Sequence, residues 1–135
     1  PTYHLRPQKG LKPKLTEDGT SGTYLFRGPD SSRPLAVFKP VDEEQFAPNN
    51  PRSFRGNFGD ATFRQGVRSG ESTLRELVAY LLDSKSFSSV PKTIIAEISA
   101  EVFPSQDDPS CQNVYQVSKT LFSKNDKLTN YENHS

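Results

Sequence analysis

The sequence predicts an α+β fold, in which an antiparallel sheet of about five strands packs against one main helix. Short runs rich in β-branched and aromatic residues occur in both halves of the chain, separated by clusters of turn-forming residues. Between the halves lies one stretch whose apolar residues recur at helical spacing. A chain of 135 residues is the size of one domain.

Strands in the first half of the chain are expected at residues 14–16, 23–27 and 35–39. A turn that begins at Gly28 separates the last two, so an antiparallel hairpin is the simplest arrangement. Residues 1–13 are polar and carry prolines, and we expect an extended lead-in there. The domain itself would then span residues 14–122.

Residues 40–70 form a long irregular stretch with several prolines, asparagines and glycines. A loop of about 30 residues is unusual in a compact domain and is usually functional or disordered. Its phenylalanines argue against disorder, because aromatic side chains need a surface to pack on. They are Phe46, Phe54, Phe58 and Phe63.

The main helix is predicted at residues 72–85. Its apolar residues recur at i, i+3, i+4, i+7 and i+8, which gives a single stripe that we assign to the core. They are Leu74, Leu77, Val78, Leu81 and Leu82. Ser72 or Thr73 can cap the helix, and Thr73 and Glu76 have the spacing of a capping box. Glu76 would then face solvent, opposite the stripe.

Two further strands are expected at residues 93–98 and 114–119, and a polar tail follows at 123–135. The single cysteine, Cys111, lies between these strands. It cannot form an internal disulfide, and it suits a reducing compartment.

The composition excludes several classes of protein. Hydrophobic residues make up only 32% and mean hydropathy is −0.73, which indicates a loop-rich chain or one that shares its core with further residues. The net charge of +1 gives no general attraction to nucleic acid. No apolar run approaches the roughly 20 residues that span a bilayer. Because the chain begins with Pro1, we expect a segment cut from a longer protein.

Three features occur in an order that suits nucleotide binding. Small residues at 19–23 let a backbone turn approach phosphates closely, Lys39 closes an apolar strand, and Glu71 precedes the helix. Each alone has an ordinary interpretation: a hairpin turn, an edge lysine and an acid that complements the helix dipole. Together they favour a cleft in which Lys39 contacts phosphates and Glu71 orients it.

The segments GTSGTYLF, LAVFKPVDEEQFAPNNPRSF, GVRSGESTLRELVAYLLD and VPKT resemble the N-terminal lobe of the phosphatidylinositol 3-/4-kinase family. The resemblance is closest to the type II phosphatidylinositol 4-kinases, especially the plant gamma-type forms, some of which accompany ubiquitin-like domains. It covers residues 15–121, and 38–51 is its most specific part. Gln45 stands where members of that family often have proline.

The resemblance implies a role for each part of the site. ATP would contact Asp18, Gly19, Thr20, Ser21, Gly22, Thr23, Tyr24, Lys39 and Glu71, and a hinge at Val117, Ser118 and Lys119 would bind adenine. Substrate would contact Glu44, Gln45 and Phe46, and a membrane would contact Arg52, Phe54, Arg55, Phe58 and Arg64. For the acid that pairs with Lys39, Glu43 and Glu44 remain open beside Glu71.

The implied function is the ATP-binding lobe of a phosphatidylinositol 4-kinase-like enzyme, which transfers the γ-phosphate of ATP to an inositol-lipid hydroxyl with Mg²⁺. We expect an intracellular, cytoplasmic protein with peripheral membrane contact, no nucleic-acid partner and a C-terminal lobe in the same parent chain. The family's catalytic aspartate and magnesium ligands lie in that lobe, so this segment alone should be inactive. The alternatives are a protein Ser/Thr kinase on the same fold and a non-catalytic scaffold.

Overall fold

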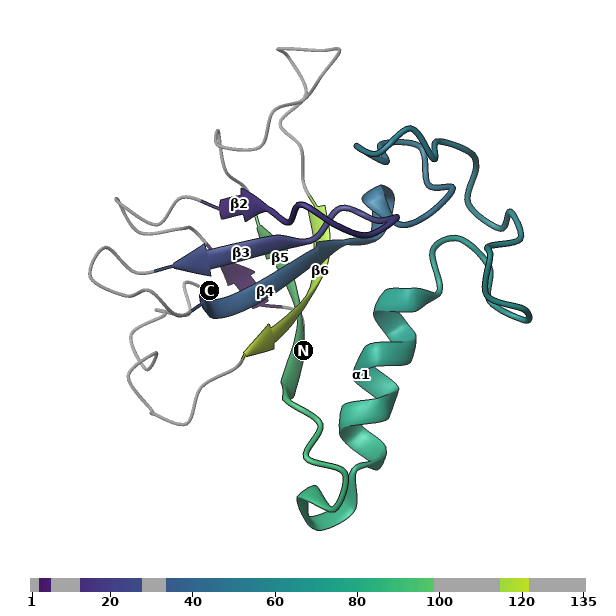
Figure 1. The fold of residues 1–135 in the computed structure, drawn as a ribbon. Helices are drawn as coiled ribbons and strands as arrows, with labels where there is room; N and C mark the ends of the chain where they lie inside the picture. The colour runs from purple at the N-terminus through teal and green to yellow at the C-terminus, as the bar shows by residue number, and fades with distance from the viewer. Residues whose placement is uncertain (1–2, 6–12, 28–33, 99–114, 122–135) are drawn as a thin grey trace.

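The computed structural model of the chain describes residues 3–5, 13–27, 34–98 and 115–121 (Figure 1). These residues form one six-stranded sheet with the strand order β1-β5-β6-β4-β3-β2. The strands are β1 (Tyr3–Leu5), β2 (Pro13–Leu15), β3 (Tyr24–Arg27), β4 (Pro34–Pro40), β5 (Lys92–Ile98) and β6 (Tyr115–Leu121). All neighbours are antiparallel except β1 and β5. The helices are α1 (Ser72–Leu82) and the 3₁₀ turns η1 (Val41–Glu43) and η2 (Ser84–Ser86).

The predicted α+β class and antiparallel hairpin are confirmed, and the predicted strands lie within two residues of those observed. The expected number of about five strands omitted β1, which lies in the predicted lead-in and pairs parallel with β5. The three residues of β1 carry no local signal of a strand, because their pairing partner is the distant β5. Cys111 and the predicted tail at 123–135 lie outside the described residues.

The β3–β4 hairpin carries the aromatic core of the sheet. Tyr24 lies opposite Phe38, and Phe26 lies opposite Ala36, so all four side chains share one face. Phe38 is completely buried, and its ring makes edge contacts with Tyr24 and Phe26 at centroid distances of 6.0 and 5.8 Å. Because side chains alternate along a strand, Lys39 lies on the opposite face from Phe38. The burial of Phe38 in the core therefore makes the Lys39 side chain point away from the aromatic core.

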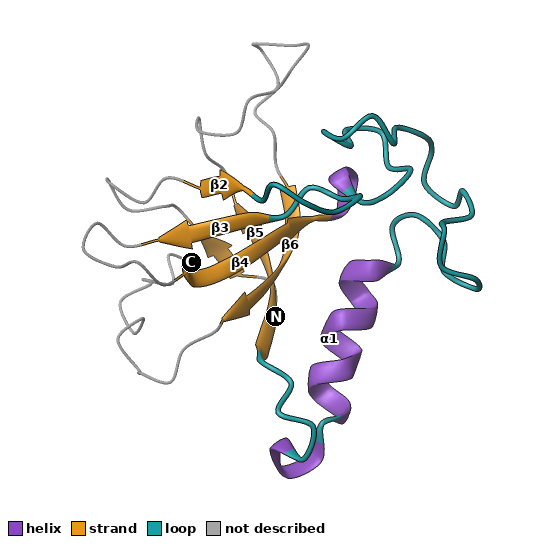
Figure 2. Cartoon of the chain, in the orientation of Figure 1, coloured by secondary structure: helices purple, strands orange, loops and turns teal. Residues whose placement is uncertain are grey.

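Helix α1 lies beside β5 and β6 (Figure 2). Its sheet-facing residues are the buried Thr73 and the half-buried Glu76, Leu77 and Tyr80. These positions are themselves spaced i, i+3, i+4 and i+7. The helix therefore presents a partly polar stripe to the sheet.

The assignment of the whole leucine stripe to the core is wrong. Leu74, Val78, Leu81 and Leu82 are 57%, 49%, 68% and 75% exposed. The expectation that Glu76 faces solvent is wrong for the same reason, because the helix is rotated so that Glu76 faces the sheet. Apolar spacing defines a face of a helix but does not say which surface covers it.

The end of the helix is also earlier than the predicted residue 85. Lys85 has a φ of 56°, which breaks the helical conformation. The Asp83 carboxylate accepts hydrogen bonds from the amides of Ser88 and Val90 at 2.7 and 2.8 Å, and this turns the chain toward β5.

The segment from residue 41 to residue 71 joins β4 to α1 and is irregular, as predicted, but it is closely bonded. Asn50 is 1% exposed and forms its centre. Its Nδ2 donates to the carbonyls of Thr20, Glu43 and Glu44 at 2.7, 3.2 and 3.0 Å, and its Oδ1 accepts from the amides of Arg52 and Phe54. One buried amide side chain therefore ties this segment to residue 20.

A small aromatic cluster packs within the same segment. The rings of Phe46, Phe54 and Phe63 meet edge to face at centroid distances of 5.3 to 6.3 Å. In the ranges that the structure describes, no helix is long and apolar enough to cross a bilayer.

Candidate functional site

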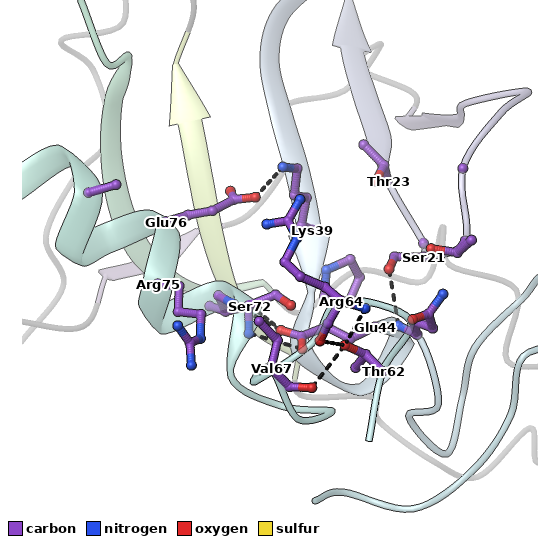
Figure 3. Close-up of a pocket in the computed structure, with 17 residues that line it drawn as sticks. Ser21, Thr23, Lys39, Glu44, Thr62, Arg64, Val67, Ser72, Arg75 and Glu76 are labelled. Atoms are coloured by element: carbon purple, nitrogen blue, oxygen red, sulfur yellow. Dashed lines mark hydrogen bonds and ion pairs between the residues drawn. The ribbon is translucent and has the colours of Figure 1, made fainter. Parts of the chain in front are cut away.

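A cleft of about 510 Å³ lies between the turn at residues 19–23 and the first half of α1 (Figure 3). We call this turn, whose residues are Gly19–Thr23, the glycine loop. The floor of the cleft carries Lys39 and Pro40 from the end of β4. Arg64, from the segment before α1, also lines the cleft (Figure 3). The predicted glycine loop and Lys39 thus line one cleft.

Lys39 forms an ion pair and a hydrogen bond with Glu76 of α1. The two side chains are 37% and 32% exposed and both line the cleft, so the pair is half-buried there. The helical stripe that faces the sheet carries Glu76 to this position. A lysine held in this way keeps its ammonium at the cleft wall and available to an anion.

Glu71 does not pair with Lys39, and the prediction that it orients the lysine is wrong. Its carboxylate accepts from the Arg75 guanidinium at 3.1 Å and from the Arg68 amide at 3.2 Å. The Arg68 amide and then Arg75 lower the pKa of the Glu71 carboxyl below its usual value. The open alternatives Glu43 and Glu44 are also engaged elsewhere.

Glu44 anchors the N-terminus of α1. Its side chain is 4% exposed. Its two oxygens accept from the amides of Gly70, Ser72 and Thr73 at 2.8, 3.2 and 2.9 Å, and from the Thr73 hydroxyl at 3.0 Å. A carboxylate at this end of a helix satisfies free N–H groups and complements the helix dipole.

The expected caps at Ser72 and Thr73 are therefore replaced by an acid 28 residues upstream of Ser72. The backbone cap position is Glu71, which makes no side-chain capping bond. Both oxygens of Glu44 thus bond to the start of the helix at the edge of the cleft, and its contact with substrate stays a prediction.

Glu43 lies beneath the glycine loop and is 5% exposed. Its carboxyl accepts from the Tyr24 hydroxyl at 2.8 Å, and its backbone carbonyl accepts from the Gly22 amide at 2.8 Å. A Cβ added at Gly22 would lie 2.7 Å from the Glu43 Cβ, too close for any side chain. Glycine at position 22 is therefore required by this close approach.

Burial raises the pKa of the Glu43 carboxyl from its usual 4.5 to about 7, although the Tyr24 hydrogen bond opposes the shift. The folded state thus holds this proton more tightly than the unfolded state does. As pH rises from 4.5 toward 7, the unfolded chain ionises first, so the free energy of unfolding falls across this window and levels off above it.

We therefore expect Glu43→Gln to reduce the fall in stability between about pH 5 and about pH 8, by up to roughly 3 kcal/mol. Urea midpoints of the wild type and the variant at the two pH values measure this difference. Burial also raises the pKa of the neighbouring Asp42, and the Asp42 charge contributes to the shift at Glu43, so the difference between the two proteins includes this coupling. If the free energy of unfolding changed equally with pH in the two proteins, the raised pKa of Glu43 would be contradicted.

Arg52 holds the glycine loop from the far side. Its Nε donates to the Ser21 carbonyl and its Nη1 donates to the Glu17 carbonyl, both at 3.0 Å. Its Nη2 donates to the carbonyl and the hydroxyl of Thr16. The Arg52 guanidinium is therefore engaged within the fold, whereas its contact with a membrane stays a prediction.

The structure places the remaining predicted residues as follows. Asp18 is exposed and does not line the cleft, whereas Tyr24 is buried behind it. Gln45 lines the cleft, and its amide donates to the Ser21 hydroxyl at 3.0 Å. Phe46 and Phe54 belong to the aromatic cluster and Arg64 to the cleft, while Arg55 and Phe58 are exposed.

The predicted hinge lies inside the sheet. Val117, Ser118 and Lys119 pair with Pro40, Lys39 and Phe38 of β4 on one side and with β5 on the other. Backbone groups in a strand with two neighbours are used by the ladders. This register does not support their use as an adenine-binding hinge.

Sequence reasoning missed Glu76 and Asn50 as parts of the site, and it assigned Arg64 to a membrane contact although Arg64 lines the cleft. The only available signal for Glu76 was its place three residues after Thr73, on a helix that follows Lys39 in sequence. Among the described residues, no group of three His, Cys, Asp or Glu side chains could hold a metal ion.

The sequence is similar to those of several plant phosphatidylinositol 4-kinases. The chain is 35% identical over 128 residues to phosphatidylinositol 4-kinase gamma 5 of Arabidopsis thaliana, covering 94% of this chain and 20% of that protein. It is 42% identical over 109 residues to phosphatidylinositol 4-kinase gamma 8 of the same plant, covering 80% and 20%. Phosphatidylinositol 4-kinase gamma 4 of Oryza sativa subsp. japonica is 35% identical over 98 residues.

The chain spans about a fifth of the length of the curated relatives it matches. No family model and no solved structure matches it. The predicted resemblance to plant gamma-type phosphatidylinositol 4-kinases is confirmed.

Proposed function

We propose that this chain, as a relative of the plant phosphatidylinositol 4-kinases gamma, forms the kinase-like, ATP-binding N-terminal lobe of a lipid kinase. The observation that carries the proposal is the Lys39–Glu76 pair on the wall of the cleft that the glycine loop covers. A strand lysine held by a helix carboxylate beneath a small-residue loop is the arrangement by which protein kinases hold the phosphates of ATP.

The cleft suits a polyphosphate in shape and charge. The glycine loop brings small residues to the cleft, so a phosphate can approach its backbone closely, and Lys39 supplies a positive charge from the end of β4. Its volume of about 510 Å³ lies within the range of small-molecule sites. When bound, Mg²⁺ would neutralise charge on the phosphates. Residues of this chain orient the nucleotide, and we assign to them no proton transfer.

The fixed backbone of the glycine loop also supports this assignment. Gln45, Asn50 and Arg52 each bond to the loop at a different point. Electrostatic stabilisation of phosphoryl transfer depends on groups that are already oriented before the reaction. The neighbouring segment therefore supplies the orientation that a small-residue loop cannot supply alone.

The proposal is tested with the full-length protein, MgATP carrying a labelled γ-phosphate, and two acceptors. One acceptor is phosphatidylinositol in phosphatidylcholine vesicles, and the other is a mixed protein substrate. We expect label in the lipid. Label only in protein would favour a protein kinase, and no transfer with no nucleotide binding by calorimetry would favour a scaffold.

A further inference from the structure

We infer that Arg64, which the folded segment before α1 places in the same cleft as Lys39, is a second phosphate-binding cation of this site. The inference rests on the proposed function and adds to it a residue whose position in the sequence gives no such signal. In Figure 3 the Arg64 side chain extends into the cleft toward Lys39. Two cations thus approach one space from different elements.

A tight hairpin at residues 61–68 presents Arg64 at its tip. Ala61 and Arg68 form an isolated antiparallel bridge. Inside it, the Thr62 amide donates to the Val67 carbonyl and the Val67 amide donates to the Arg64 carbonyl, both at 3.1 Å. The Thr62 hydroxyl donates to the Val67 carbonyl at 2.9 Å. The backbone of Arg64 is therefore defined by local bonds.

The hairpin is attached on both sides of the cleft. The Phe63 amide donates to Gln45 Oε1 at 2.7 Å, and the Phe63 ring packs on Phe46 at 5.3 Å. On the other side, Arg75 Nη2 of α1 donates to the Gly66 carbonyl at 3.0 Å. These attachments hold the tip over the cleft and limit its freedom to turn away.

The described carboxylates around the cleft are paired with groups other than Arg64, so the Arg64 guanidinium is available to a ligand. Glu76 pairs with Lys39, and Glu71 pairs with Arg75. Glu44, the other carboxylate that lines the cleft, accepts bonds from α1. Within the described ranges of the chain, the Arg64 guanidinium has neither a hydrogen-bond partner nor an ion-pair partner.

Phosphate is the ligand that this group suits best. A guanidinium presents parallel N–H donors that match the oxygens of a phosphate in pairs, which a lysine ammonium does not. Two sources bring phosphate to this cleft under the proposed function: the polyphosphate end of the nucleotide, and the headgroup phosphate of an inositol lipid. Both use the same chemistry at Arg64.

The test uses full-length Arg64→Ala and Arg64→Lys, with Arg27→Ala as the matched control. Arg27 is an exposed arginine at the end of β3, remote from the glycine loop, and it does not line the cleft. Calorimetry measures binding of adenosine, MgADP and MgATP. Initial rates give the KM for MgATP and, separately, the KM for phosphatidylinositol in phosphatidylcholine vesicles.

If Arg64 contacts the nucleotide, Arg64→Ala should weaken MgATP binding by about tenfold or more while adenosine binding is unchanged. If it contacts the lipid headgroup, the KM for phosphatidylinositol should rise by a similar factor with nucleotide binding unchanged. In either case Arg64→Lys should recover part of the loss, and Arg27→Ala should behave as wild type.

The inference is overturned if Arg64→Ala matches Arg27→Ala in every arm while the wild type binds nucleotide and transfers phosphate. That outcome would leave the proposed function intact. A wild-type protein that binds no nucleotide would overturn the proposed function, and the role of Arg64 with it.

Discussion

Replacing Lys39 by alanine in the full-length protein is expected to lower phosphoryl transfer from MgATP by about 10²–10³-fold. The variant removes the one cation that β4 brings to the cleft beneath the glycine loop. Glu76→Gln should lower the rate by roughly 10²-fold, because it releases the ammonium from its partner and lets the lysine move out of position. Initial rates with labelled ATP measure both effects.

Glu71→Gln is the matched control, because Glu71 is also an acid at the N-terminal end of α1 and lies only five residues before Glu76. Glu71 itself does not line the cleft, its partner Arg75 is exposed, and exposed pairs of this kind contribute little. Its rate should stay within about twofold of wild type. If Glu71→Gln lost as much activity as Glu76→Gln, the assignment of Glu76 as the partner of Lys39 would be wrong.

Glu44→Ala should cause the largest loss of stability, on the order of 3 kcal/mol. The side chain accepts four hydrogen bonds at the start of α1, and its removal leaves buried amide donors without a partner. It also removes the negative charge that complements the helix dipole. Urea unfolding followed by circular dichroism measures the change.

Two further variants make this expectation specific. Glu44→Gln keeps one acceptor oxygen and should lose only part of the stability. Glu17→Ala removes an acid whose side chain is 89% exposed, and it should stay within about 0.5 kcal/mol of wild type. Equal stability of Glu44→Ala and Glu17→Ala would refute the anchoring role of Glu44.

The sequence was sufficient to predict the hairpin and the lysine at its end. Alternating apolar residues define β3 and β4, and the same alternation places Lys39 on the face opposite Phe38. Small residues at 19–23 mark the turn. These are local properties, and local periodicity predicts them well.

The partner of Lys39 could not be predicted from local pattern. Which acid reaches the lysine depends on the rotation of α1, and the bonds from Glu44, 26 to 29 residues away, fix the start of that helix. The leucine stripe suggested the opposite rotation, because apolar residues are usually assigned to the nearest core. A contact of long sequence separation outweighed this preference.

The roles of Arg52 and Arg64, two basic residues in a loop, also could not be predicted from local sequence. Both belong to one stretch of alternating arginines and phenylalanines, which predicts a surface that meets a membrane. In the folded chain, Arg52 bonds to the backbone around the glycine loop and Arg64 lines the cleft. Composition alone could not separate these roles.

The attachments of the glycine loop through Asn50 and Arg52 have a thermodynamic consequence. A flexible strap of glycine, serine and threonine would lose conformational entropy on closing over a ligand, and this loss would weaken binding. Here the restriction is already imposed during folding, so the binding step retains more of its favourable free energy.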